Sequence, residues 1–282
     1  MNTKAGPKSI LFAKNYSADM EKREVFKELQ HTDPSGRHIV ASGYYEKGTG
    51  EWVFRTTEWN SWCSRSGSSR CLWLHGIPGA GKTVLISHII GHMEQAFVRD
   101  AGDEKSCVVY YYCHFENKQN EAVPMLYWVL SQLCRKSDVI PSSTYAMVKK
   151  GTQPTQADLL DAIADALSPF RAVYLALDAI DEAEQRSYLL RVLRQLATER
   201  RFQKIRLVVT SREYQDIEDA LRPFSIPLPL LNEVVTQDIR TYLESALSGS
   251  IEVHRHFSTH PRWTPELRAL MLEKITEKAN GM

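Results

Sequence analysis

Five short apolar runs alternate with longer amphipathic segments between residues 71 and 230. The runs lack the strict apolar–polar alternation of a strand with one solvent-exposed face, so we expect strands that are buried on both faces. Parallel strands need long crossover connections, which are usually helices. The pattern therefore predicts an α/β fold in which helices flank a five-stranded parallel sheet. The predicted strands are Cys71–His75, Cys107–Cys113, Val173–Leu177, Ile205–Val209 and Phe224–Leu230.

The helices of this core are predicted from apolar residues that recur three and four positions apart. Thr155 followed three positions later by Asp158 is typical of a capped helix start. The predicted core helices lie around Leu85–Phe97 and Met125–Cys134, and over Gln156–Leu167 and Gln185–Thr198.

The two ends of the chain have weaker patterns. We expect a short helix over Ala18–Gln30 that buries Met20, Phe26 and Leu29, a turn at Asp33–Gly36, and a linker over Gly43–Gly50. Trp52, Trp59 and Trp62 are expected to pack into the core. Helices over Thr236–Leu247 and from Thr264 onward form a small helical tail. These expectations divide the chain into an amino-terminal segment (1–50), a core (51–230) and a tail (231–282).

A phosphate-binding loop is predicted at the first strand end. Residues 76–83 fit the pattern G-x-x-x-x-G-K-[S/T], with an apolar strand before them and a helix after them. Backbone N–H groups in such a loop point at phosphates, the lysine reaches the terminal phosphates, and the hydroxyl after it ligates Mg²⁺. The predicted nucleotide-binding residues here are Gly76, Pro78, Gly79, Ala80, Gly81, Lys82, Thr83 and Val84, with Thr83 also a metal ligand.

Acidic residues follow the predicted strand at Val173–Leu177. We expect Asp178 to hold Mg²⁺, directly or through water. The next residue is Ala179, where many related ATPases carry a catalytic glutamate, so water activation would fall to Asp181 or Glu182. The alternative is that these two carboxylates only cap the following helix.

Arg212 lies just beyond the predicted strand at Ile205–Val209. Arg212 follows the run Leu207–Ser211 and can sense the terminal phosphate from there. The alternative is a solvated arginine that begins the next helix.

Composition excludes several other classes of protein. The 35 Lys and Arg residues against 34 Asp and Glu give a net charge of +1, so no overall field favours nucleic acid or a membrane, and we expect neither as a partner. We expect no signal peptide, and no apolar run approaches the roughly 18 residues of a membrane span. Five cysteines without a C-x-x-C pair favour a reducing, cytoplasmic location.

His88 and His92 lack further ligands at metal spacing and are expected to be packed or exposed residues.

Three motifs together resemble the NACHT domain of the STAND class of P-loop NTPases. They are the loop at 76–83, the block Leu175–Glu184 and the strand end Val208–Arg212, while the approach from Gly48 to Cys63 is similar to fungal nephrocystin-like members. The resemblance implies a sheet of the additional-strand ATPase class with strand order 5-1-4-3-2. It also implies that ADP holds a monomer and that ATP permits assembly into a ring. In that family a winged helix and sensor repeats follow; we expect that this chain is truncated before them and that its effector and sensor domains are missing.

Two functions remain open from the sequence. The first is an ATP/ADP switch with slow Mg²⁺-dependent hydrolysis and self-assembly into a homo-oligomer when ATP is bound. The second is a scaffold that keeps the fold without turnover and docks a partner through Trp52–Trp62 or the amino-terminal segment. A GTPase is disfavoured because the run Asn117–Asn120 lacks the aspartate that reads guanine.

Overall fold

The protein is represented by a computed structural model. It describes residues 20, 22–29, 33–64, 67, 69–99, 105–117, 120–137, 139–230, 232–248 and 264–279.

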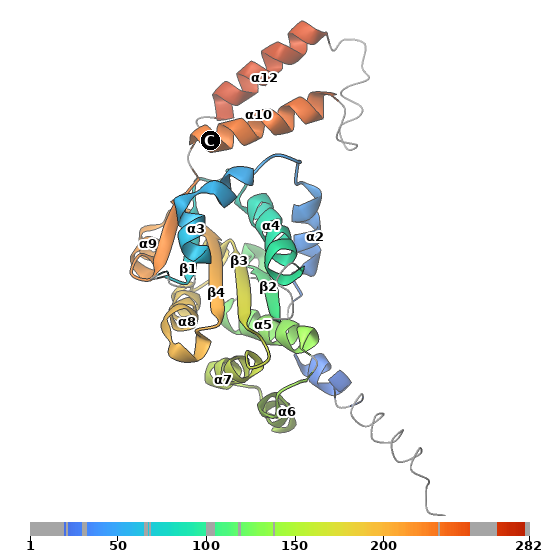
Figure 1. Cartoon of the computed structure of the whole chain (residues 1–282), viewed down its shortest axis with the longest axis vertical. Coiled ribbons are helices and arrows are strands. Elements are labelled where there is room, and N and C mark those ends of the chain that lie inside the picture. The colour runs from blue at the N-terminus through green and yellow to red at the C-terminus, as the bar shows by residue number, and fades with distance from the viewer. Residues whose placement is uncertain are drawn as a thin grey trace, which may run out of the picture.

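A five-stranded parallel sheet forms the centre of the fold (Figure 1). The strand order is β2-β3-β4-β1-β5, and all four neighbouring pairs are parallel. The predicted α/β fold and the order 5-1-4-3-2 are both confirmed. The strands are β1 (Cys71–His75), β2 (Ser106–Tyr112), β3 (Ala172–Asp178), β4 (Ile205–Ser211) and β5 (Ser225–Pro229).

Helices cover both faces of the sheet because successive strand residues point to opposite sides. In β1, Cys71 and Trp73 join one apolar cluster, while Leu72 and Leu74 join the other. The first cluster packs under α5 (Ala122–Lys136), α7 (Gln156–Ala166), α8 (Ser187–Thr198) and α9 (Gln215–Leu221). The second packs under α2 (Ser35–Gly43), α3 (Thr57–Cys63) and α4 (Lys82–Met93).

The predicted helix cap at Thr155 and the predicted burial of Trp59 and Trp62 are confirmed. Thr155 and Asp158 form the predicted capping box at the start of α7, and Trp59 and Trp62 are buried. The helix α4 continues as a π-helical turn over Glu94–Arg99. Short 3-10 turns lie at Glu51–Arg55, Phe115–Asn117, Ile180–Glu182 and Arg200–Phe202.

Some expectations at the amino-terminal end were wrong. The turn expected at Asp33–Gly36 is the start of α2, which Pro34 precedes. Residues 20 and 22–28 are helical and Leu29 is buried, as expected, but Met20 is 49% exposed. Further along the chain, the helix α6 (Ser142–Lys149) was not predicted, and α9 was expected only as a helix of unstated length after Arg212. Residues 30–32, including the end of the predicted helix, lie outside the described residues.

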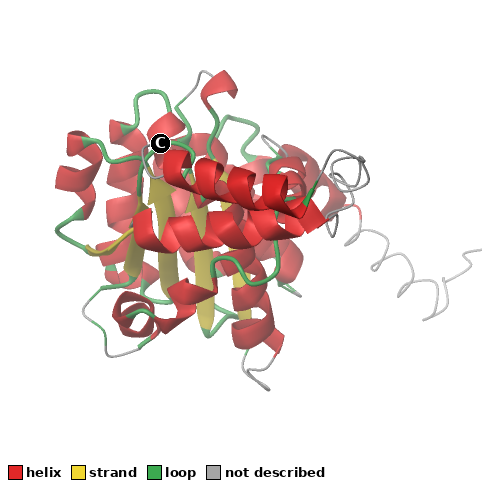
Figure 2. Cartoon of the chain, turned by 90° about the horizontal axis from the view of Figure 1, so that it is seen from above, coloured by secondary structure: helices red, strands yellow, loops and turns green. Residues whose placement is uncertain are grey.

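The tail helices α10 (Asn232–Ser248) and α12 (Pro265–Ala279) pack side by side beyond the carboxyl ends of the strands (Figures 1 and 2). Thr264 accepts a hydrogen bond from the N–H of Leu267, as predicted for a capping residue. Within the described part of the chain, no helix is both long enough and apolar enough to span a bilayer.

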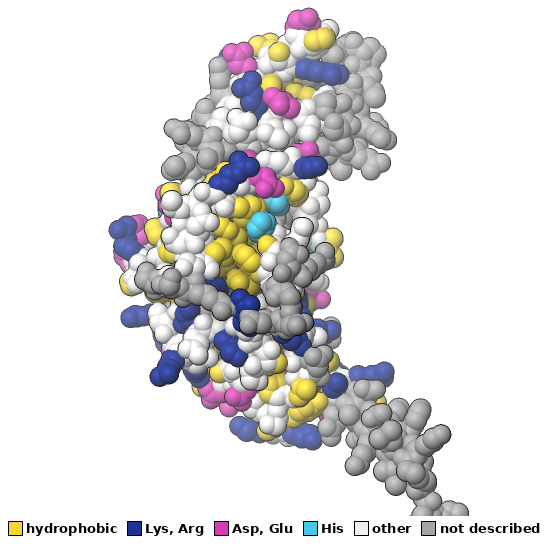
Figure 3. All heavy atoms as spheres, viewed as in Figure 1, with side chains coloured by type: hydrophobic (Ala, Val, Ile, Leu, Met, Phe, Trp, Pro, Cys, Tyr) yellow, Lys and Arg dark blue, Asp and Glu magenta, His cyan; other side chains and the backbone are white. Residues whose placement is uncertain are grey.

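On the face shown in Figure 3, apolar side chains and histidines gather over α3 and α4.

Candidate nucleotide-binding site

The loop Gly76–Gly81 joins the end of β1 to the start of α4. Gly79 and Gly81 take the left-handed conformation, with φ of 81° and 79°, which a residue with a Cβ adopts only at a cost. Gly76 is buried under the chain that follows β5, because a Cβ there would lie 3.1 Å from Cβ of Leu230. The loop is therefore open on its outer side and tightly packed on its inner side.

The amino end of α4 faces this open side. Gly81 is the residue before the helix, and no side chain caps it. The first helix hydrogen bond runs from the N–H of Leu85 to the carbonyl of Gly81. The N–H groups of Lys82, Thr83 and Val84 precede it and have no acceptor within the helix, which makes this end suited to an anion.

Lys82 spans the loop. Its Nζ donates hydrogen bonds to the carbonyls of Gly76 and Ile77, each at 2.8 Å. Burial lowers the pKa of Lys82, while the carboxylates of Asp181 and Asp178 oppose that shift. An ammonium whose hydrogen bonds among the described residues go to neutral carbonyls is placed to exchange those contacts for phosphate oxygens.

Asp178 ends β3 and is 3% exposed. Thr210 Oγ1 donates a 2.6 Å hydrogen bond to Asp178 Oδ1, and the side chain of Thr83 also hydrogen-bonds to this carboxyl group. Burial raises the pKa of Asp178 to about 6, against the effect of these hydrogen bonds. The two predicted metal ligands thus lie together, and a buried carboxylate beside a hydroxyl fits a hard cation such as Mg²⁺.

The two remaining carboxylates have different surroundings. Asp181 Oδ1 accepts the backbone N–H of Arg212 at 3.1 Å, and its Oδ2 lies 3.3 Å from Arg212 Nε. Glu182 instead accepts the N–H of Phe115 at 3.4 Å and lines a cleft with Thr83 and Asp178. Neither carboxylate caps α8, whose preceding residue Arg186 has no capping side chain.

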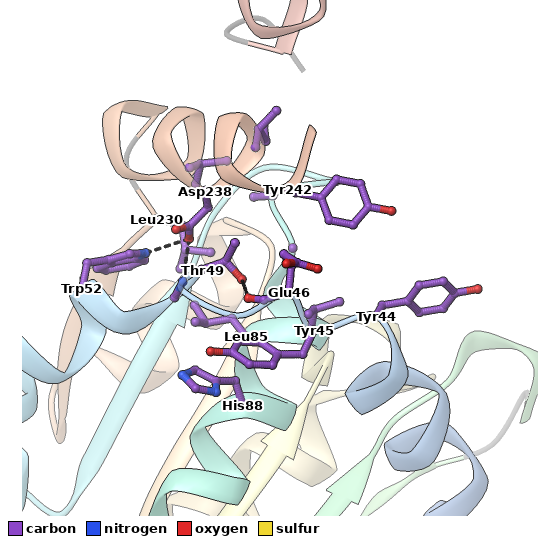
Figure 4. A pocket seen from close by; sticks show the side chains of 17 residues that line it. Tyr44, Tyr45, Glu46, Thr49, Trp52, Leu85, His88, Leu230, Asp238 and Tyr242 are labelled. Carbon is purple, nitrogen blue, oxygen red and sulfur yellow. Dashed lines mark hydrogen bonds between the residues drawn. The ribbon is translucent and has the colours of Figure 1, made fainter. Parts of the chain in front are cut away.

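Two hollows flank the start of α4 and share Tyr44 and Val84. The cleft with Glu182, about 540 Å³, holds the candidate metal ligands. The other is an apolar cavity of about 340 Å³ between the loop, residues 44–52 and α10 (Figure 4). The lining side chains that sequence reasoning did not select include Tyr45, Glu46, Leu230, Val235, Asp238, Ile239 and Tyr242.

His88 and His92 are packed against aromatic rings, and the basic residues Arg186 and Lys204 are bonded within the chain. His88 stacks on Tyr45 with ring centroids 4.1 Å apart, and His92 stacks on Phe54 at 3.7 Å. Arg186 binds Asp216 with two nitrogens, at 2.5 and 2.7 Å. Lys204 donates to the carbonyls of Leu167 and Ser168.

This topology and loop define the core of a P-loop NTPase. The chain belongs to the family described as Nephrocystin 3, N-terminal, whose model matches residues 48–212. The resemblance to nephrocystin-like NACHT proteins is therefore confirmed.

A curated relative and two solved structures are also similar to this chain. Vegetative incompatibility protein HET-E-1 of Podospora anserina is 24% identical over 239 residues, which are 80% of this chain but only 17% of that protein. The Aeropyrum pernix ORC1 protein, solved in complex with DNA, is 13% identical with a TM-score of 0.44, over 88% of this chain and 60% of that one. C. elegans PCH-2 is 16% identical with a TM-score of 0.39, over 93% of this chain and 63% of that one.

Proposed function

We propose that this chain binds ATP and ADP with Mg²⁺ and acts as a nucleotide switch with slow hydrolysis. One observation carries the proposal: Lys82 spans the loop, while Thr83 and Asp178 line a cleft at the start of α4 that adjoins an apolar cavity lined by the loop residues Gly79, Ala80 and Gly81. The apolar cavity would receive the base, the N–H groups of Gly79–Val84 the phosphates, and the cleft the terminal phosphate.

Each candidate residue has a distinct task in this proposal. Thr83 and Asp178 would hold Mg²⁺, which supplies charge neutralisation at the phosphates. Lys82 would bind the terminal phosphates, and Glu182 would orient the attacking water from the cleft. Asp181 would fix Arg212, whose side chain is 42% exposed and whose guanidinium would sense the terminal phosphate.

The proposal is tested by calorimetric titration with ATP and ADP, with and without Mg²⁺. Lys82→Ala removes the cation that spans the loop, so we expect loss of binding with an unchanged circular dichroism spectrum. Lys105→Ala is a matched control, because Lys105 lies just before β2 and over the ring of Phe170, at the opposite end of the sheet. Binding retained by Lys82→Ala would contradict the site.

We also propose that ATP favours self-association of this domain and that the protein works in the cytoplasm. The support is the membership of the family and the resemblance to NACHT proteins. Sedimentation velocity with ADP or a non-hydrolysable ATP analogue tests the first point: we expect a larger species only with the analogue. Equal sedimentation in both states, with no turnover above that of Asp178→Ala, would instead favour the scaffold function.

The division of the chain into 1–50, 51–230 and 231–282 also remains a proposal. The strands β1–β5 lie within 71–229, whereas α10 and α12 lie within the last segment. Limited proteolysis tests it, with cleavage expected first at the exposed residues Lys47 and Gly48 and near residue 231.

A further inference from the structure

Asp238 of α10 joins the helical tail to the segment before the P-loop strand. Its Oδ2 accepts two hydrogen bonds, from the backbone N–H of Gly50 and from the indole Nε1–H of Trp52, each at 3.0 Å (Figure 4). The partners lie more than 180 positions away in the sequence. Hydrogen bonds to an ionised acceptor are stronger than neutral ones, so this is a substantial tie between distant segments.

The segment that Asp238 holds is itself fixed against the P-loop helix. Gly50 has φ of 72°, and a Cβ there would lie 2.7 Å from Leu85 Cδ1 on α4. Trp52 packs against the apolar cluster that includes Leu85. The Gly50 N–H and the Trp52 indole N–H are therefore held in position to donate to the Asp238 carboxylate.

A second contact lies two helical turns further along α10. Ser245 Oγ donates a 2.7 Å hydrogen bond to Glu46 Oε1. Between the two contacts, Ile239 and Tyr242 line the apolar cavity on the α10 side, and Val235 lines it one turn before Asp238. The helix α10 is thus one wall of the cavity and is held at both ends of that wall.

The start of α10 is tied to the phosphate loop. The N–H of Leu230, two residues before the helix, donates to the carbonyl of His75 at 2.8 Å, and Leu230 covers Gly76. A rotation of α10 about this point would open the cavity without disturbing the sheet. Two contacts oppose such a rotation, the hydrogen bonds that Asp238 accepts and the Ser245–Glu46 hydrogen bond; Asp238 accepts two bonds and lies nearer the start of the helix.

We propose that Asp238 is a positioning residue that latches α10 as a lid over the apolar cavity. This inference rests on the proposed function, because the ligand under the lid is the base of a nucleotide. Release of the latch lets the base leave, so the position of α10 and the lifetime of bound nucleotide are coupled. Displacement of either residues 44–52 or the tail helices would then promote nucleotide exchange.

The test combines nucleotide release with hydrogen exchange. Release of ADP that carries a fluorescent methylanthraniloyl group is followed by stopped flow in wild type, Asp238→Ala, Asp238→Asn and Gln237→Ala. We expect release about tenfold faster in Asp238→Ala, equivalent to about 1.4 kcal/mol, and an intermediate rate in Asp238→Asn, which keeps an acceptor oxygen. Gln237 is the exposed neighbour on α10, so Gln237→Ala should match wild type.

Exchange of the Gly50 amide is measured without nucleotide, so it reports on the latch alone. We expect at least tenfold faster exchange in Asp238→Ala, with circular dichroism as a check of folding. Unchanged exchange would overturn the latch, and faster exchange with unchanged ADP release would overturn the lid role. A wild-type chain that bound no ADP would overturn the proposed function and with it the lid role, while the Gly50 exchange would still decide the latch.

Discussion

Asp181 holds Arg212 by both of its carboxylate oxygens, one on the backbone N–H at 3.1 Å and one 3.3 Å from Nε. The Asp181 side chain is only 4% exposed. A carboxylate that is buried and already engaged by a guanidinium is poorly placed to accept a proton from water. Asp181 is therefore best interpreted as the residue that orients Arg212, which leaves Glu182 as the carboxylate open to the cleft.

Glu182→Gln and Asp181→Asn should consequently have different effects. We expect Glu182→Gln to lower ATP turnover at least tenfold, because the carboxylate that would act as general base on the water is lost. The Kd for ATP should change little, because the phosphate contacts remain. Asp181→Asn should mainly weaken discrimination between ATP and ADP, because Arg212 loses its ionic partner. Steady-state phosphate release and calorimetry on the same preparations distinguish the two; equal loss of turnover with unchanged affinities would contradict the assignment.

Asp178→Asn is expected to stabilise the nucleotide-free protein at neutral pH while abolishing the effect of Mg²⁺ on binding. Burial raises the pKa of Asp178 from 3.8 to about 6. Between these values the folded chain holds a proton that the unfolded chain has lost, so stability falls as pH rises from about 4 to 6. Above pH 6 the buried charge costs on the order of 1 to 3 kcal/mol, which the uncharged amide avoids.

Thermal unfolding of wild type and Asp178→Asn from pH 4 to pH 8 measures this effect. The melting temperature of the variant should exceed that of wild type above pH 6, and the two should converge near pH 4. A variant that is less stable at pH 7.5 would show that the Asp178 charge is compensated in the folded chain.

The sequence was sufficient where a signal was local. The strand runs, the loop at 76–83 and the Thr155–Asp158 capping box each depend on neighbouring residues, and the structure contains them all. Asp178 was identified because parallel strands bring their carboxyl ends to one sheet edge. Its hydrogen bond from Thr210, which belongs to the adjacent strand β4, follows from the same arrangement.

The missed features depend on contacts between distant residues. The helix α2 begins within a run that has the composition of a turn, and His38 on it stacks on Tyr110 and hydrogen-bonds to the hydroxyl of Tyr112. The wall of the apolar cavity is formed by α10, whose cavity-facing residues have no special pattern in the sequence. Asp238 could not be distinguished from other helix-surface aspartates, because its function as a hydrogen-bond acceptor depends on Gly50 and Trp52.

The thiols should be slow to react in the folded protein. Burial raises the pKa of Cys71 and Cys107 to about 12 and that of Cys63 and Cys134 to about 11, and it raises the pKa of Cys113 well above its ordinary value. A pKa about two units above the ordinary 9.0 of a thiol lowers the thiolate fraction at pH 8 roughly a hundredfold. We expect no fast phase with Ellman's reagent in buffer and full reaction of all five thiols in guanidinium chloride.

Gly50→Ala should be strongly destabilising, and Gly36→Ala is its matched control. At Gly50 the substitution combines a left-handed φ of 72° with a Cβ 2.7 Å from Leu85 Cδ1, so both the backbone and a buried side chain must adjust. Because Leu85 Cδ1 is the end of a flexible side chain, most of the cost comes from the backbone, and we expect a loss of about 1 to 2 kcal/mol in the free energy of unfolding. Gly36 lies in α2 with nothing within 4 Å of an added Cβ, so alanine there should be neutral or stabilising by up to about 1 kcal/mol. Urea titration of both variants tests this difference, and equal midpoints would show that residues 44–52 are not held against α4 as described.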